Sequence, residues 1–377
     1  MSHIAFFGHN PGDAAVRRRA VAFRNAGCRV TGFMPRRGPA KPADFPVVDL
    51  GETRDNAYLH RLASIFTGAG RALKRRDLLA EADLLYARNL DMLATAALVR
   101  RRAGLAAPLV YECLDVHHKL TSDGLPARAL RGLERRLLRG ARLLVVSSPA
   151  FEREYFARHH AGAYRHMLVE NRLIEGDDFP PRPEAAPLHA PGAPLRLGWF
   201  GNLRCARSLD LLKRVAAAFP DRLEIDLRGY AAPGVFEDFE GEIAGHANIR
   251  FGGRYRAPQD LAGLYGGVDL VWAGDWYEAG ANSLWLLPNR IYEGGYFATP
   301  PIAPAGTETA RWIERRGAGF TIAEPVEETL EALIARLIAD REPIAAARGR
   351  LLALERTAFV EDTGTVTDLL AAVGLGR

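Results

Sequence analysis

Residues 287–295 (LPNRIYEGG) hold the side chains whose types and spacing point most directly to chemistry. Arg290 and Glu293 stand three residues apart at the start of an expected helix, just after Pro288. Side chains at that spacing project from the same side of a helix. A helix N-terminus with an arginine binds phosphate, and a carboxylate accepts hydrogen bonds from ribose hydroxyls. The pattern therefore suits a sugar nucleotide, with a surface ion pair as the simpler alternative.

Further candidates for such a ligand come earlier in the same half. Gly201 and Asn202 open a loop after an expected strand, and Arg204 and Arg207 stand just before the next helix. Backbone N–H groups, a helix N-terminus and an arginine together form a diphosphate site. Residues 275–283 (DWYEAGANS) suit a pocket wall or a core. Two asparagines complete the expected ligand-binding set: Asn282 and Asn289.

The first half offers two polar loops at expected strand ends. Asp115 comes just after a buried strand and precedes the pair His117 and His118, so it is a candidate general base, with an N-cap as the alternative role. Metal binding by the two histidines is not expected, because adjacent side chains diverge. The other loop begins Gly8-His9-Asn10 and lacks the G-x-G-x-x-G pattern of dinucleotide-binding proteins.

The composition describes a soluble globular protein of more than one domain. Of 377 residues, 48% are apolar and 25% charged. The N-terminus does not resemble a signal peptide, and Cys28, Cys113 and Cys205 match no metal or disulfide spacing. We therefore expect a cytoplasmic, reduced protein.

Charge divides the chain into a basic front half and an acidic back half. Residues 1–180 hold 29 Lys and Arg against 19 Asp and Glu, a net of +10, and residues 181–377 hold 21 against 26, a net of −5. The front half should therefore meet something anionic. A nucleic acid is not expected, because aromatic residues are not interleaved with the charges. An anionic membrane surface fits the pattern, and one helix near residues 58–76, with Leu59, Leu62, Ile65 and Phe66 on one face, is a candidate for lying on it.

The order of apolar runs predicts the architecture. Short buried-strand candidates alternate with helical stretches in both halves, which is typical of parallel sheets covered on both faces. Six prolines between residues 180 and 194 mark a stiff linker. We therefore expect an α/β protein with two doubly wound Rossmann-like domains facing a central cleft: residues 1–180, a linker at 181–194, and residues 195–377. For the last helix, packing back on the first domain is an alternative.

Taken together, these motifs resemble those of a known family. The glycine-asparagine loop, then P-N-R-x-Y-E-G-G before a strand with Pro-Pro-Ile-Ala, is similar to GT-B glycosyltransferases, chiefly the family 4-like bacterial group. With the N-terminal IAFFGHNPGDAAVRRRAVAF and the stretch VYECLDVHHKL, the chain resembles exopolysaccharide glycosyltransferases of the succinoglycan type over nearly its whole length.

The resemblance implies an activity and roles for these residues. A hexose would move from a nucleoside-diphosphate sugar, with UDP the expected nucleotide, to a lipid-linked or saccharide acceptor. Glu293 would bind the donor ribose, and Arg290, Arg204 and Arg207 would face the diphosphate. Asp115 would lie near the acceptor hydroxyl, or Asp115 or His118 would contact the sugar if the configuration is retained. Three residues of the first loop would lie on the acceptor side: Gly8, His9 and Asn10.

The chemistry is expected to need no metal and no cofactor. No D-x-D motif stands at a strand end, since Glu224 and Asp226 lie within an expected strand. Arginines and a helix N-terminus would stabilise the leaving diphosphate instead. One departure from the family stands out. The glutamate that usually stands seven residues before the ribose-binding one is absent, because position 286 is Leu286. The sequence therefore leaves open whether the linkage is inverted or retained.

Three other functions fit parts of the pattern. A sugar-nucleotide epimerase of the same fold would need acid and base residues on both sides of the sugar, for which Asp275 and Glu278 are the candidates in the second half. A sugar-binding protein of the periplasmic type is disfavoured, because it would not need arginines placed to bind phosphate. A non-catalytic partner of a transferase is compatible with the absence of the usual glutamate at position 286.

Overall fold

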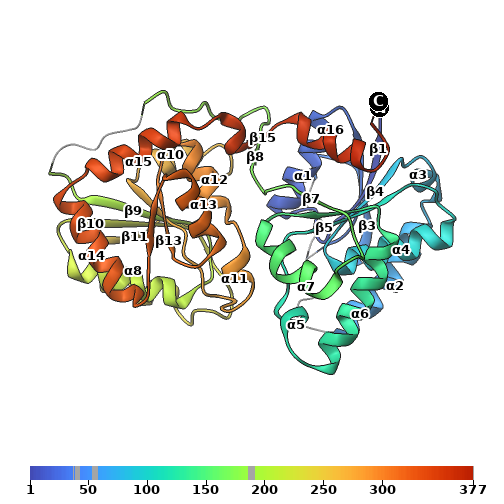
Figure 1. The fold of residues 1–377 in the computed structure, drawn as a ribbon, viewed down its shortest axis with the longest axis horizontal. Helices are drawn as coiled ribbons and strands as arrows, with labels where there is room; N and C mark the ends of the chain where they lie inside the picture. Colours follow the sequence, from blue (N-terminus) through green and yellow to red (C-terminus); the bar gives the residue numbers. More distant parts are fainter. Residues whose placement is uncertain (37, 39–42, 53–57, 186–191, 377) are drawn as a thin grey trace. The chain divides into compact units, whose positions relative to one another are not determined.

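Two compact units, each built on a parallel β-sheet, make up the chain (Figure 1). The first unit comprises Met1–Ile174 together with Glu361–Arg377, and the second comprises Glu175–Val360. This computed structural model describes residues 1–36, 38, 43–52, 58–185 and 192–376, apart from the side chains of 58–62 and 118. Residues 186–191 of the expected linker lie outside the described residues.

The first unit holds a seven-stranded sheet in the order β3-β2-β1-β4-β5-β6-β7, with parallel pairing throughout. Its central strands are buried along their whole length, as expected of strands covered on both faces. The strands are β1 (His3–Phe7), β2 (Arg29–Arg36), β3 (Val47–Glu52), β4 (Leu84–Arg88), β5 (Leu109–Cys113), β6 (Leu143–Val146) and β7 (His166–Leu168).

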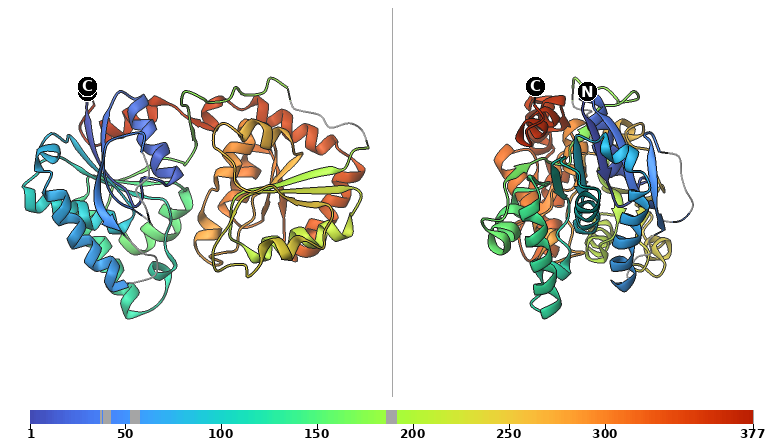
Figure 2. Two further views of the ribbon diagram at one scale, coloured as in Figure 1. Left: turned by 180° about the vertical axis from the view of Figure 1, so that it is seen from behind. Right: turned by 90° about the vertical axis from the view of Figure 1, so that its right-hand side faces the viewer.

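Helices from both ends of the chain cover this first sheet (Figure 2). They are α1 (Ala14–Asn25), α2 (Tyr58–Leu73), α3 (Arg76–Ala80), α4 (Leu90–Ala103), α5 (His118–Thr121), α6 (Leu125–Gly140), the π-helical turn η1 (Phe151–Phe156), α7 (Ala157–His160) and the C-terminal α16 (Thr363–Ala372). Helix α16 buries Val366 and Leu369 in the same core as Val16 and Phe23 of α1. The chain end therefore belongs structurally to the unit that contains the chain start.

The second unit holds a six-stranded parallel sheet in the order β11-β10-β9-β12-β13-β14. Its strands are β9 (Leu195–Leu203), β10 (Leu223–Ala231), β11 (Ile249–Phe251), β12 (Leu270–Trp272), β13 (Pro301–Pro304) and β14 (Phe320–Ile322). Its helices are α8 (Ala206–Ala218), α9 (Phe239–Ile243), α10 (Leu261–Gly266), α11 (Asn282–Trp285), α12 (Asn289–Tyr296), α13 (Glu308–Arg316), α14 (Val326–Ala339), α15 (Glu342–Ala353) and the short 3₁₀ turn η2 (Arg356–Ala358). Strands β8 (Leu173–Ile174) and β15 (Val360–Glu361) form a separate two-stranded sheet.

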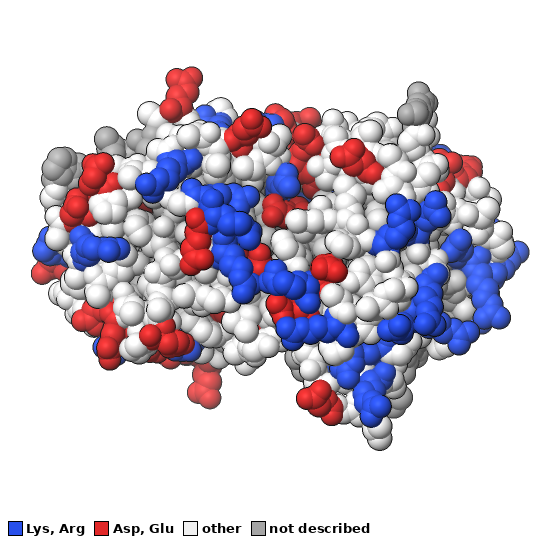
Figure 3. Space-filling model, viewed as in Figure 1, with Lys and Arg blue, Asp and Glu red and all other residues white. Residues whose placement is uncertain are grey.

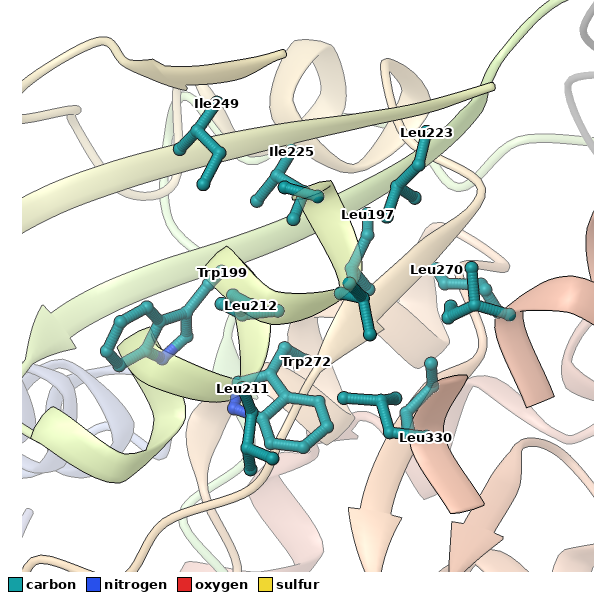
Figure 4. Packing of buried hydrophobic residues seen from close by; sticks show 14 of the residues in the cluster. Leu197, Trp199, Leu211, Leu212, Leu223, Ile225, Ile249, Leu270, Trp272 and Leu330 are labelled. Carbon is teal, nitrogen blue, oxygen red and sulfur yellow. The ribbon is translucent and has the colours of Figure 1, made fainter. Parts of the chain in front are cut away.

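The core of the second unit shows how its sequence selects these elements. Figure 4 shows Trp199 of β9 and Trp272 of β12 beside Leu211 of α8, with Leu330 of α14 close by. All four side chains are at most 3% exposed. Large apolar side chains from neighbouring strands and covering helices thus pack together in one core. Because the strands are parallel, their carboxyl ends and the loops that follow them lie at one edge of the sheet.

The structure corrects the expected end of one strand. Strand β9 continues to Leu203, so Gly201 and Asn202 pair with Gly229 and Tyr230 of β10 instead of opening a loop. A side chain on Gly229 would place its Cβ 1.7 Å from the Gly201 carbonyl oxygen. The strands can therefore pair this far because position 229 is glycine, and Gly201 itself adopts a φ of 107°, which favours glycine.

Two other expectations concern exposed faces. Glu224 and Asp226 lie within strand β10, as the sequence predicts, and Glu224 is exposed while Asp226 is half-buried. On α2, Phe66 is 58% exposed and Ile65 is half-buried, while the side chains of Leu59 and Leu62 lie outside the described residues. Across the described part of the chain, no helix combines the length and apolar character that crossing a membrane requires.

Candidate functional site

Helix α12 carries the segment that the sequence singles out. It begins at Asn289, directly after Pro288, and no side chain caps its N-terminus. An uncapped helix N-terminus attracts anions through its backbone N–H groups and its dipole. A side chain on Gly295 would place its Cβ 2.2 Å from the Phe359 ring, so the glycine allows α12 to lie against that residue.

Arg290 lies in the first turn of α12 and is only partly satisfied by protein. Its Nη1 donates to the Phe200 carbonyl at 3.2 Å. Its Nε is buried and has no hydrogen-bond partner among the residues that the structure describes. Burial lowers the pKa of Arg290, an effect that Asp275 opposes, but an arginine stays charged in proteins. A partly buried guanidinium with an unused, buried Nε–H is suited to an anion that supplies the missing acceptor.

Glu293 is buried at 4% exposure, so the alternative of a surface ion pair is wrong. Its Oε2 accepts a hydrogen bond from the Tyr265 hydroxyl at 2.8 Å. Burial raises the pKa of Tyr265 well above its usual value, and the nearby Glu293 adds to this shift, so the hydroxyl remains a donor. Tyr265 therefore fixes one carboxylate oxygen of Glu293.

The two arginines near β9 have different surroundings. Arg204 binds the buried Asp275 at 2.9 Å and lies over the Tyr277 ring at 5.2 Å. The charge of Asp275 raises the pKa of Arg290, and the charge of Arg204 lowers it.

Arg207 instead pairs with two carboxylates at the start of α14. Its Nη2 lies 3.2 Å from Glu327 and 3.4 Å from Glu324, and its guanidinium lies 4.7 Å from the centre of the Trp276 ring. Among the other residues predicted for this site, Asn202 is exposed, Asn289 half-buried and Asn282 buried at 2% exposure. Arg290 and Glu293 thus lie one turn apart on α12, whereas Arg204 and Arg207 are held by different carboxylates.

In the first unit, the loop after β1 is held by its own polar residues. Gly8 is buried, and Asn10 Oδ1 accepts from the Gly12 N–H at 3.1 Å. His9 Nε2 lies 3.6 Å from the Asp13 carboxylate, which also caps α1. Burial disfavours the charged form of Asp13, but its contact with His9 holds its pKa well below the usual value.

The loop after β5 places Asp115 at the surface. Asp115 is exposed, and its carbonyl accepts a weak hydrogen bond from the Cys113 thiol at 3.5 Å. His117 Nδ1 accepts from the Lys119 N–H at 3.2 Å. His118 begins α5, but its side chain lies outside the described residues. The three cysteines of the chain are buried, and none forms a disulfide.

Sequence reasoning missed two groups beside these sites. Tyr265 stands 28 residues before its partner Glu293, so no local pattern indicates it. Asn89 follows β4 directly, with φ 69°, and its Nδ2 lies 3.5 Å from His9 Nδ1. A non-glycine residue in this left-handed region is costly and often marks a functional site. The position of Asn89 directly after an expected strand was the sequence feature that could have indicated it.

Clusters of His, Cys, Asp and Glu able to hold a metal ion are not found among the described residues. No family model matches the chain. A curated relative does: the succinoglycan biosynthesis protein ExoL of Rhizobium meliloti is 39% identical over 342 residues, which cover 89% of this chain and 85% of that protein.

Solved structures share the fold over nearly the whole chain. A sucrose-phosphate synthase from Thermosynechococcus elongatus aligns with a TM-score of 0.74 and 17% identity, covering 99% of this chain and 100% of that one. HepE of Anabaena, in complex with UDP and glucose, aligns with a TM-score of 0.69 and 19% identity, covering 98% of both chains. These comparisons confirm the resemblance found in the sequence. The chain belongs to the family of the succinoglycan biosynthesis protein ExoL and is a glycosyltransferase of the GT-B fold.

Proposed function

We propose that this glycosyltransferase of exopolysaccharide synthesis transfers a hexose from a UDP-sugar to a lipid-linked or saccharide acceptor. The observation that carries the proposal is the pair on α12: Arg290 with its unpartnered buried Nε, and Glu293 one turn further along. The complex of HepE with UDP and glucose supports UDP as the nucleotide.

We assign each chemical group of the sugar nucleotide to residues that can bind it. Arg290, Arg204 and the N-terminus of α12 bind the diphosphate, whose charge increases as the bond to the sugar breaks. Glu293 accepts hydrogen bonds from the ribose hydroxyls, and the hydrogen bond from the Tyr265 hydroxyl orients its carboxylate. These groups stabilise the leaving nucleotide without a metal ion or a cofactor, so a chelator should leave transfer unchanged.

The acceptor side is assigned to the first unit. In an inverting reaction, the acceptor hydroxyl attacks the anomeric carbon and gives its proton to Asp115, while the nucleoside diphosphate leaves. In a retaining reaction, Asp115 or His118 contacts the sugar instead. The exposure of Asp115 supports either role, since the carboxylate is accessible to a substrate. Gly8, His9 and Asn10 border the same end of the sheet, because β1 and β5 are parallel members of it.

A lipid-linked acceptor places the enzyme at a membrane. The excess of basic residues in the first 180 positions supports peripheral binding to an anionic surface, on the inner face of the plasma membrane.

The test compares UDP binding with transfer in matched variants. Glu293→Ala should weaken UDP binding at least about tenfold by calorimetry, because a hydrogen bond to a charged group contributes about 1.5–3 kcal/mol. Asp115→Ala should keep UDP binding and lose transfer. Glu314→Ala, which removes an exposed carboxylate of α13, serves as the control. Unchanged UDP affinity in the Glu293 variant would contradict the ribose assignment.

A further inference from the structure

Helix α6 of the first unit has an outer surface that its packing does not explain. Its buried positions are Ala127, Glu134 and Leu138. Leu125 is 79% exposed and Leu133 is 38% exposed. With Ala129 and Leu137 they recur every fourth residue, which places them in one row along the helix. This leucine row (Leu125, Ala129, Leu133 and Leu137) lies beside the buried face and extends onto the exposed surface.

The rest of the outer surface of α6 is basic. The helix holds five arginines and one glutamate, and that glutamate, Glu134, is fully buried. Arg131 and Arg135 donate to backbone carbonyls of neighbouring segments. Arg128, Arg136 and Arg139 are exposed. An arginine flank beside an apolar row is typical of helices that lie in a membrane interface.

Two hydrogen bonds join α6 to the other basic runs of this unit. Arg100 of α4 donates to the Gly140 carbonyl at the end of α6 at 3.0 Å. Arg76 of α3 donates to the Arg102 carbonyl at 3.1 Å. The ends of these runs therefore lie side by side. We call their exposed basic residues the basic ridge: Lys74, Arg76, Arg101, Arg102, Arg128, Arg136 and Arg139. Figure 3 shows Lys and Arg side chains gathered over this part of the first unit.

We propose that the basic ridge and the leucine row dock the first unit on an anionic lipid bilayer, with α6 in the interface. The inference rests on the proposed function for its biological purpose, an acceptor carried by lipid. Charge complementarity favours anionic headgroups, and the exposed leucines favour a bilayer over a purely polar polyanion. The assignment moves the docking surface from α2, where the sequence suggests it, to α6.

The test is flotation of the full chain with phosphatidylcholine vesicles that contain or lack phosphatidylglycerol. The wild-type chain should float only with the anionic vesicles. Arg128→Glu/Arg136→Glu should lower the partition constant at least about tenfold, because each basic residue near an anionic surface contributes to binding. Leu125→Asn/Leu133→Asn should also lower it. The matched control, Arg250→Glu/Arg336→Glu, changes the same charge on exposed positions of the second unit and should bind as the wild type does.

Equal partitioning of the α6 charge variant and the control would overturn the proposal, and so would heparin binding without vesicle binding. Thermal shifts with UDP, measured on the same proteins, separate this inference from the proposed function. A variant that no longer floats with the vesicles but still shows the thermal shift with UDP has lost membrane docking and kept nucleotide binding. A wild-type chain that floats without any UDP shift would contradict the donor assignment and leave the docking surface standing.

Discussion

The Nε of Arg290 is the clearest unmet hydrogen-bonding group at the candidate donor site, and its loss has a specific expected effect. Arg290→Met should weaken UDP binding at least about tenfold, because a charged hydrogen bond contributes about 1.5–3 kcal/mol. Arg290→Lys should lose less UDP affinity than Arg290→Met, since lysine keeps the positive charge but lacks the planar set of guanidinium N–H donors. Isothermal titration calorimetry with UDP measures both.

Arg290→Met should lower the melting temperature only modestly, which separates a binding role from a structural one. The substitution removes one hydrogen bond, from Nη1 to the Phe200 carbonyl, together with a buried Nε whose lack of a partner among the described residues destabilises the folded state. Arg250→Met, at an exposed position of β11, is the control for UDP affinity. An Arg290→Met chain that binds UDP normally would remove this arginine from the diphosphate site.

At the scale of elements, a buried ion network joins two strands of the first sheet to α1 and to the returning C-terminal segment. Glu112 of β5 binds Arg88 of β4 at 2.6 Å and Arg19 of α1 at 3.2 Å, and Arg19 also binds Glu361 of β15 at 2.6 Å. Burial alone would raise the pKa of Glu112, but Arg88 and Arg19 hold it below the usual value.

The lowered pKa of Glu112 determines how the stability of the folded protein changes with pH. The stabilisation by Glu112 is fully present above its unfolded pKa of about 4.3 and is lost as the pH falls through its folded pKa. Glu112→Gln should therefore cost about 3–5 kcal/mol at neutral pH, because it leaves a buried arginine without its charge partner. It should also flatten the fall in stability on acidification, measured by urea unfolding at several pH values. Glu81→Gln, which breaks an exposed pair with Arg29, should cost less than about 1 kcal/mol.

These elements also show what the sequence could and could not predict. Buried strands such as β1 and β4 were predicted because a continuous apolar run needs only local information. The placement of Arg290 and Glu293 on one side of a helix was predicted because they stand one helical turn apart in the sequence. The pairing of Tyr265 with Glu293, and that of Asp275 with Arg204, was not predicted, because these residues are far apart in the sequence and only the tertiary fold brings them into contact. The end of β9 was misplaced because Gly201 ordinarily breaks a strand, and its tolerance depends on Gly229 opposite.

At the scale of the molecule, the chain end completes the unit that contains the chain start. Four apolar residues of the C-terminal segment are buried in the first unit: Val366, Leu369, Leu370 and Val373. Burying each contributes about 1.5–3 kcal/mol, so together they match the whole stability of a typical domain, about 5–15 kcal/mol. Glu361 adds a buried charge partner for Arg19.

Truncation after Val360 should therefore unfold the first unit and spare the second. Calorimetry of the truncated chain should lose one thermal transition, while the remaining transition still rises with UDP, because the candidate donor residues lie in the second unit. Hydrogen exchange should show β1 unprotected and β9 protected. Leu369→Ala, a milder change, should lower only the first unit's transition, since a buried Leu→Ala substitution costs about 2–5 kcal/mol. A truncated chain with both transitions intact would show that α16 is dispensable for the first unit, and loss of both would show that the two units do not unfold independently.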